Sequence, residues 1–203
     1  IHQRLSQEKG KPMTTMKNDE TTITRCINGV DLDTLMSTVN AIQADPELGV
    51  CRFRASNKWL DGSRNRSCVT GFYGAKQEIE HNQPFQMDAD EPAILAGSNE
   101  AANPVEHLLH ALASCVTTSM VAHAAVRGIQ IEELESQLEG DIDLRGFLGL
   151  AADVPKGYTH IRVKFRVKAR EEDLPRLKEL AAFSPVLNTV VNSAKVDVDV
   201  VLK

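Results

Sequence analysis

The most hydrophobic part of the chain, residues 103–127, is apolar on almost every face that a helix would present. It opens with Asn103 and Pro104, which suit the N-cap and the first position of a helix. It ends just before Gly128, a natural helix stop. A helix that is apolar around most of its circumference is buried rather than half-exposed on a surface. The pattern therefore predicts a long core helix with one cysteine, Cys115, near its middle.

Three shorter helices are predicted from apolar residues at helical spacing. Residues 28–44 form an amphipathic pattern, and either Asp31 or Asp33 can cap its start. Residues 171–182 carry a stripe of leucine and alanine. Residues 184–192 start with Ser-Pro, which favours a new helix because Ser is a good N-cap and Pro a good first residue.

Apolar and polar residues alternate in several other segments, which is typical of strands with one buried face. In the first segment Cys51, Phe53 and Ala55 are expected to face inward, with Arg52 and Arg54 facing solvent. The predicted strands are 50–58 and 67–73, which form a hairpin, then 131–144, 161–169 and 195–202, with a further short strand at 76–80 or 84–88.

Helices and strands are segregated along the chain rather than alternating regularly, which predicts an α+β fold. The expected organisation has three parts. Residues 1–22 are interpreted as a vector remnant and disordered leader, residues 23–47 as a helical extension, and residues 48–203 as the main domain. Residues 88–102 are expected to form an irregular acidic loop before the core helix.

Composition narrows the classes of partner. The net charge of -5 argues against nucleic acid or an anionic membrane surface. The basic residues of segment 161–169 alternate, so they are expected to form the wet face of a strand. The most apolar window, residues 108–126, contains several polar side chains and is interpreted as a core helix rather than a membrane span.

The first residues contain no hydrophobic signal-peptide core, which favours a cytoplasmic protein. The four cysteines, Cys26, Cys51, Cys68 and Cys115, lie far apart and include no CxxC pair. Free thiols are therefore expected rather than a disulfide framework.

One combination of motifs resembles the OsmC/Ohr family of thiol peroxidases. It consists of the string from Asn103-Pro104-x-Glu106 to Ala113-Ser114-Cys115, followed by Gly140-Asp141-Ile142-Asp143 and then Ser184-Pro185-Val186. The likeness covers about residues 48–203. It implies antiparallel sheets around a long buried helix, an intertwined homodimer with two sites at its interface, and reduction of organic hydroperoxides by paired cysteines. The helix at 28–44 is similar to an addition found in one OsmC-like branch.

The resemblance implies two catalytic residues. Cys115 matches the peroxidatic cysteine, whose thiolate attacks the O–O bond and becomes a sulfenic acid. Arg64, in the turn Gly62-Ser63-Arg64-Asn65, resembles the family's activating arginine, which stabilises the thiolate and the leaving alkoxide. Arg54 and Arg66 are nearby competitors for this role.

Two helper positions depart from the family pattern. Ser184 stands where the family usually has its resolving cysteine, and it cannot form a disulfide. Val105 stands where a glutamate usually pairs with the arginine. Glu106 follows one residue later, although an acid in the first turn is also explained by the helix dipole. Cys51 and Cys68, on the predicted hairpin, are the alternative resolving thiols if the fold brings one of them close.

Glu106, Ser184 and His107 are the expected binding residues around the cysteine. His107 and His110 could also hold a metal as an i, i+3 pair, but no HExxH motif or carboxylate partner accompanies them. They are interpreted as packing or hydrogen-bonding at the dimer interface. Neither a metal nor a cofactor is expected.

Three functions stay open. The first is a cytoplasmic hydroperoxide reductase that works through Cys115 beside Arg64 and is recycled by an external thiol. The second is a non-catalytic dimer that binds a small apolar ligand in the interface pocket, with Cys115 only a small buried hydrophobe. The third is a structural dimer whose partner is another protein. A second copy of the chain is the expected partner in the first two, without nucleic acid or membrane.

Overall fold

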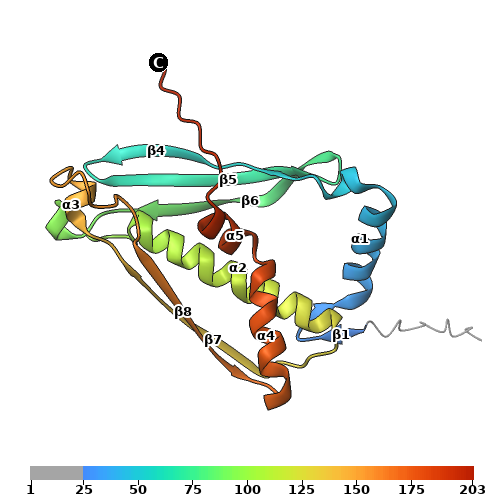
Figure 1. Cartoon of the computed structure of the whole chain (residues 1–203). Coiled ribbons are helices and arrows are strands. Elements are labelled where there is room, and N and C mark those ends of the chain that lie inside the picture. Colours follow the sequence, from blue (N-terminus) through green and yellow to red (C-terminus); the bar gives the residue numbers. More distant parts are fainter. Residues whose placement is uncertain (1–24) are drawn as a thin grey trace, which may run out of the picture.

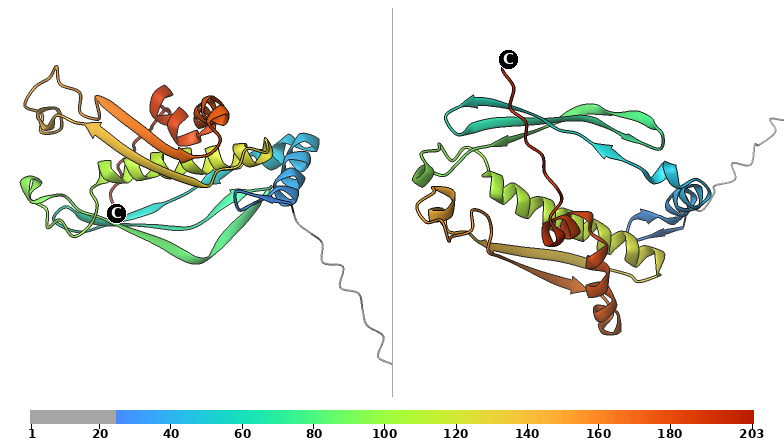
Figure 2. Two further views of the ribbon diagram at one scale, coloured as in Figure 1. Left: turned by 90° about the horizontal axis from the view of Figure 1, so that it is seen from below. Right: turned by 45° about the horizontal axis from the view of Figure 1, so that its top comes forward.

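A computed structural model describes residues 25–203 and places one long helix between two antiparallel sheets (Figures 1 and 2). The strands are β1 (Cys26–Ile27), β2 (Val30–Asp31), β3 (Arg52–Phe53), β4 (Ser56–Asp61), β5 (Arg64–Gly74), β6 (Gln77–Ala89), β7 (Glu133–Asp141) and β8 (His160–Lys168). The helices are α1 (Leu32–Ala44), α2 (Pro104–Val126), α3 (Leu144–Phe147), α4 (Leu174–Leu180) and α5 (Pro185–Asn192), with 3-10 turns η1 (Pro46–Gly49), η2 (Ala93–Leu95), η3 (Glu171–Asp173) and η4 (Ala181–Phe183). The prediction of an α+β fold with antiparallel sheets is confirmed.

The predicted core helix is confirmed almost to the residue as α2. Asn103 caps it through a hydrogen bond from the Glu106 N–H, and Gly128 follows its end with a positive φ of 71°. Its buried residues Leu112, Val116 and Met120 join the core cluster that also contains residues of α4, while β7 and β8 pack against it. By length and composition alone, α2 is the one helix in residues 25–203 that could cross a membrane. Its packing makes it the central helix of the core.

The first sheet is longer than the sequence predicted. β5 lies in its middle, paired with β6 along one edge and with β4 and then β3 along the other. The β4–β5 hairpin confirms the predicted one. The two alternatives for a third strand, 76–80 and 84–88, are parts of a single strand, β6, which a β-bulge opposite residues 69–71 lets follow the twist of β5.

The second sheet is the β7–β8 hairpin, and its outer face is a ladder of opposite charges. Glu133 is opposite Lys168, Glu135 opposite Arg166, and Glu139 opposite Arg162. All three cations form ion pairs with acids of β7 or the residue before it. The prediction that the basic residues of β8 form a wet face is confirmed.

The position of Gly140 on β7 has a steric reason. A Cβ at this residue would lie 2.4 Å from the ring of Tyr158, which folds back over the strand from the loop before β8. The Tyr158 hydroxyl then donates to the Val105 carbonyl at 3.0 Å. The loop between β7 and β8 begins with one helical turn, α3, which is capped by Asp143.

The amino-terminal segment differs from the predicted helix over 28–44. Asn28 and Gly29 both have positive φ, 53° and 77°, and form the turn of the small β1–β2 hairpin. Helix α1 therefore starts only at Leu32, with Asp31 as its N-cap, accepting from the Asp33 and Thr34 N–H groups. The predicted leader, residues 1–22, lies outside the described residues.

Asn28 also fastens this hairpin to the end of the central helix. Its side-chain amide donates to the Ile129 carbonyl and accepts from the Ile131 N–H, both at 2.9 Å. The side chain thus bonds the loop backbone as a strand would. Because Ile129 lies three residues after the last residue of α2, the amino-terminal hairpin is held close to the point where the core helix ends.

We expect Asn28→Gly to lower the free energy of unfolding by about 1–3 kcal/mol, because glycine keeps the left-handed backbone and removes only the two hydrogen bonds. Urea titration at neutral pH measures this difference. Asn99→Gly is the matched control, since Asn99 also has a positive φ, of 56°. An equal loss of stability in both variants would show that the side-chain bonds of Asn28 contribute nothing.

Two predictions fail within the single chain. Phe53 was expected to face inward, yet it is 75% exposed, and Trp59 on the neighbouring strand is 68% exposed. The predicted strand at 195–202 is not formed, because residues 193–203 leave α5 without a hydrogen-bonded neighbour and end clear of the other elements (Figure 1). Both exceptions concern apolar surface for which the described chain supplies no cover.

Candidate functional site

Cys115 lies near the middle of α2 and is half-buried. At about 100° per residue, its side chain points roughly 100° away from Val116, which belongs to the core face. The thiol is therefore neither on the fully buried face nor fully in solvent. Such partial access is what a reactive cysteine needs, whereas an inert structural cysteine is usually fully buried.

Arg64 is the first residue of β5, immediately after the turn at Gly62, whose φ is 52°. Its guanidinium forms an ion pair with the carboxylate of Glu100 at 3.5 Å, and both side chains are about half exposed. The pair borders a small cavity of about 60 Å³ in front of the amino-terminal end of α2, lined also by Asp88 and Ala101.

The competing arginines are engaged elsewhere. Arg54 forms two hydrogen bonds to Glu78, and Arg66 forms two to Asp88. These contacts, hydrogen bonding first, raise the pKa of both guanidinium groups and lower the pKa of both carboxyl groups. Arg64 forms a single ion-pair contact at 3.5 Å, so its guanidinium is the least constrained of the three. The structure therefore favours Arg64 as the site arginine.

One chain does not bring Arg64 and Cys115 together. Glu100, the partner of Arg64, precedes the helix, whereas Cys115 follows Pro104 by eleven residues, or roughly 17 Å along the helix axis. Within residues 25–203 no hydrogen bond or ion pair joins the two catalytic candidates. A site that uses both must be completed by a movement or by a second copy of the chain.

Glu106 has a structural task. Its carboxylate accepts from the Asn103 N–H at 2.8 Å, while the Asn103 side chain accepts from the Glu106 N–H at 2.9 Å. This reciprocal arrangement is a capping box, which satisfies two free donors at the start of a helix. It supports the first-turn interpretation of Glu106 and leaves its carboxylate occupied at the helix start, away from Arg64.

Ser184 is fully buried, and its hydroxyl accepts from the Leu187 N–H at 3.2 Å as the N-cap of α5. The N-cap interpretation of this position is confirmed. His107 hydrogen-bonds through Nε2 to the Asp88 carbonyl at 2.9 Å, which ties α2 to β6. Of the three expected binding residues, Ser184 and Glu106 cap helices, and His107 links α2 to β6.

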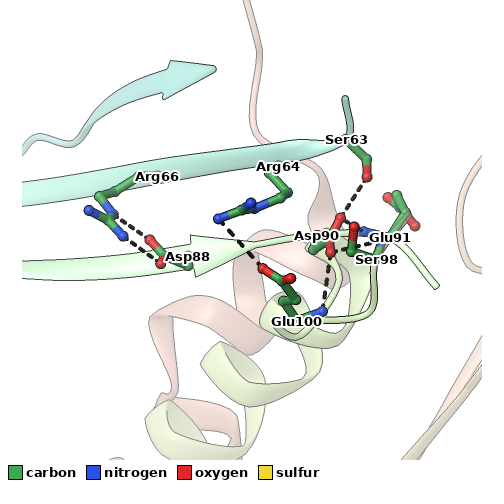
Figure 3. A network of polar contacts seen from close by, with 8 residues as sticks. All are labelled: Ser63, Arg64, Arg66, Asp88, Asp90, Glu91, Ser98 and Glu100. Carbon is green, nitrogen blue, oxygen red and sulfur yellow. Dashed lines mark hydrogen bonds and ion pairs between the residues drawn. The ribbon is translucent and has the colours of Figure 1, made fainter. Parts of the chain in front are cut away.

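Sequence reasoning missed the most organised polar group of the site region, Asp90 (Figure 3). Its carboxylate is 1% exposed and accepts from the Ser63 hydroxyl at 2.6 Å. It also accepts from the N–H groups of Glu91, Ser98 and Glu100 at 2.8 to 3.1 Å. These donors, led by the Ser63 hydroxyl, lower the pKa of Asp90 to about 2. The buried Asp90 carboxylate thus bonds the backbone of the loop before α2 and links this loop to Ser63.

The four cysteines are free thiols, as predicted. Cys26 and Cys51 are exposed, whereas Cys68, on β5, is half-buried like Cys115. No disulfide joins any two of them, so the structure identifies no resolving partner for Cys115 among them.

An apolar groove of about 430 Å³ opens on another side of α2. Val116 and Met120 form its floor, Phe165 and Val167 of β8 form one wall, and Leu174 of α4 forms the other. Its volume lies within the usual range for small-molecule sites. Cys115 is not among the lining residues, so the groove is distinct from the surroundings of the thiol.

Comparison with known proteins identifies the family. The model of the OsmC-like protein family matches residues 97–199, which include α2, β7, β8 and α5. The chain belongs to this family. A comparison with curated protein sequences gave no match.

Solved structures show the same fold at low sequence identity. An OsmC-like protein from Mycoplasma pneumoniae is 17% identical, with a TM-score of 0.54, over 70% of this chain and 89% of that one. A Psychrobacter arcticus protein assigned to the osmotic stress induced and detoxification response is 18% identical, with a TM-score of 0.50, over 66% of this chain and 85% of that one. The OsmC-like fold predicted from the sequence is confirmed.

Proposed function

We propose that the protein is a one-cysteine hydroperoxide reductase that works as a homodimer. The observation that carries this proposal is Cys115, a half-buried thiol on the central helix, at the position that the family string assigns to the peroxidatic cysteine. Arg64 is the cation that supports it, because it is held by a single ion-pair contact while Arg54 and Arg66 are each fixed by two hydrogen bonds.

The reaction follows from these two groups. The Cys115 thiolate attacks one peroxide oxygen, the S–O bond forms as the O–O bond breaks, and the alkoxide leaves and takes up a proton to become an alcohol. Arg64 stabilises the alkoxide charge. The sulfenic acid then condenses with an external thiol to a mixed disulfide and water. A second external thiol releases Cys115 and leaves as a disulfide. This cycle suits a reducing compartment such as the cytoplasm.

The homodimer is supported by the amount of exposed surface. The chain exposes 16754 Å², whereas a folded monomer of 22.3 kDa exposes roughly 9,400 Å². Residues 1–24 lie outside the described part, and a chain of that length can expose at most about 3,800 Å² of the difference. An excess of several thousand Å² remains, which is the size of interface that obligate dimers bury.

The apolar part of this surface is concentrated in two places. On the first sheet, Trp59, Phe85 and Met87 share one face, because their partners on β5 are residues 65, 69 and 67. The second place is the carboxyl-terminal tail, residues 194–203, whose valines and leucine are 77% to 102% exposed. A second copy can cover the sheet face and supply an edge for the tail, and this exchange makes the dimer intertwined.

A dimer also supplies what one chain lacks at the site. In one chain Arg64 pairs with Glu100, which precedes α2, whereas Cys115 lies near the middle of that helix. A two-fold related copy brings a second Arg64 to the assembly. We infer that Arg64 of one chain serves Cys115 of the other. The interface arrangement is thus part of the proposed active site.

The test is peroxide consumption by the Cys115→Ser variant. We expect the rate with an organic hydroperoxide and dithiothreitol, followed by stopped flow, to fall at least about a hundredfold, because serine is not an effective nucleophile toward peroxide at neutral pH. Cys51→Ser, at an exposed cysteine, is the control and should keep the wild-type rate. Equal rates in the wild type and Cys115→Ser would refute the proposal.

The apolar groove favours a second candidate function, the binding of a small apolar ligand without catalysis. Its lining of Val116, Met120, Phe165 and Leu174 offers such a molecule a dry surface. In the same experiment this candidate would be favoured by a wild-type protein that consumes no peroxide and carries a co-purified ligand in native mass spectrometry.

A further inference from the structure

The ion pair between Arg64 and Glu100 is held together by a third residue, Asp90 (Figure 3). The Asp90 carboxylate accepts from the hydroxyl of Ser63, the residue before Arg64, and from the backbone N–H of Glu100. Both members of the pair are therefore fixed to one buried carboxylate, one through its neighbour and one through its own backbone.

The loop around Asp90 is closed by further bonds. The Ser98 N–H donates to the same carboxylate at 3.1 Å, and the Asn99 N–H donates to the Glu91 carbonyl at 3.1 Å. Gly97 is needed here, since a Cβ on it would lie 1.8 Å from the Glu91 carbonyl oxygen. Residues 90–100 thus form a compact loop that presents the side chain of Glu100 toward the first residue of β5.

The ion pair between Glu100 and Arg64 is looser than the ion pairs that Arg54 and Arg66 form. Arg54 and Arg66 are each held by two hydrogen bonds, which use one edge of the guanidinium and both oxygens of the partner carboxylate. Arg64 has one ion-pair contact at 3.5 Å. A carboxylate in this relation restricts where the guanidinium lies and leaves N–H donors for another anion.

We propose that Glu100 is the positioning residue that orients Arg64 toward the reacting cysteine, with Asp90 as the scaffold that holds both. The inference rests on the proposed function. It places the orienting carboxylate in the loop before α2, whereas the resemblance places it at position 105, where this chain has valine. Glu106 does not fill the role because its carboxylate caps the helix.

The experiment uses the full-length dimer with Cys26, Cys51 and Cys68 replaced by serine, so that alkylation by iodoacetamide reports Cys115 alone. The pH midpoint of the alkylation rate is measured for this protein and for Glu100→Gln, Arg64→Met and their combination. Glu91→Gln is the matched control, because it removes the same charge from the same loop and, within residues 25–203, its side chain forms no hydrogen bond or ion pair with Arg64.

The two roles open to Glu100 shift this midpoint in opposite directions. If Glu100 positions Arg64, its loss misplaces the cation, and the midpoint rises by about 0.5 to 1 pH unit, in the direction of the Arg64→Met shift. The combined variant then shows no further shift. If Glu100 acts only as a nearby negative charge, its removal favours the thiolate and the midpoint falls.

A fall, or no change, in Glu100→Gln overturns the proposal, and so does an Arg64→Met variant with an unchanged midpoint. A rise shared by Glu91→Gln also overturns it, because the effect would then come from a general change in the loop and not from the contact between Glu100 and Arg64. Peroxide consumption measured in parallel separates this inference from the proposed function. Failure of the proposed function appears as wild-type protein without Cys115-dependent turnover, whatever the alkylation midpoints show.

Discussion

Replacing Val198 and Val200 by threonine should raise the dissociation constant of the dimer at least about a thousandfold. Both valines lie on the apolar side of the alternating tail and are almost fully exposed in one chain. If the tail pairs with a second copy, each Val→Thr exchange puts a hydroxyl in place of a buried methyl group and costs roughly 1–2 kcal/mol. A two-fold dimer contains four such positions, so the losses add to several kcal/mol.

Light scattering after gel filtration, over a range of protein concentrations, measures this effect. Wild-type protein is expected at twice the chain mass of 22.3 kDa throughout. Asp197→Thr with Asp199→Thr is the matched control, because it introduces the same residue on the polar side of the tail and should leave the dimer intact. A dimer of unchanged affinity in the valine variant, or a monomeric wild type, would contradict the exchange of tails.

Asp90→Asn should lower the midpoint of thermal unfolding by about 5–10 °C at neutral pH. Asparagine replaces an acceptor oxygen by an NH2 donor, so buried N–H groups that now bond the carboxylate lose their partner. Differential scanning calorimetry of the wild type and the variant measures the difference. Asp61→Asn, an exposed carboxylate at the neighbouring turn, is the control and should leave the midpoint within about 1 °C.

The same pair of proteins tests the pH dependence. The pKa of Asp90 is about 2 in the folded chain, below its ordinary value of 3.8. Above pH 3.8 the carboxylate is ionised in both states and its stabilisation is complete. As the pH falls below that value the unfolded chain takes up the proton first, and the stabilisation is lost down to about pH 2. The wild type should therefore lose its advantage over Asp90→Asn across this range. A constant difference between pH 5 and pH 2 would refute this origin of the stability.

The elements with local signals could be predicted from the sequence. Asn103, Pro104 and Gly128 define α2 because capping residues and a positive-φ glycine act over a few bonds. Ser184-Pro185 defines the start of α5 for the same reason. The start of α1 was placed four residues early, although Asn28-Gly29 is a typical signal for the two-residue turn that the structure contains.

The candidate site could be predicted only in part. The family string identifies Cys115, and the turn before β5 identifies Arg64. Glu100 and Asp90 could not be found, because residues 88–100 contain four acids and nothing local distinguishes the buried carboxylate from the exposed ones. Which of them is buried depends on the approach of Ser63 from the turn between β4 and β5, 27 residues earlier, and that is a property of the folded chain.

The alternation in the tail and on the first sheet predicted buried faces, whereas the described chain leaves both faces exposed. Phe53 and Val198 obey the rule that alternating apolar residues need a partner. A prediction made from one sequence assumes that this partner belongs to the same chain. For this protein the uncovered apolar surface is the observation that supports the proposed second copy.

The charge ladder on the β7–β8 hairpin has a consequence for how two copies meet. The outer face of β7 carries mainly acids and that of β8 mainly bases. An edge of β8 that approached the same edge of another copy would set Arg162, Arg166 and Lys168 against like charges. Such repulsion is a known safeguard against edge-to-edge aggregation. The ladder therefore selects among assemblies, since it discourages growth through identical β8 edges while leaving the carboxyl-terminal tail, with its row of valines, free to join its partner.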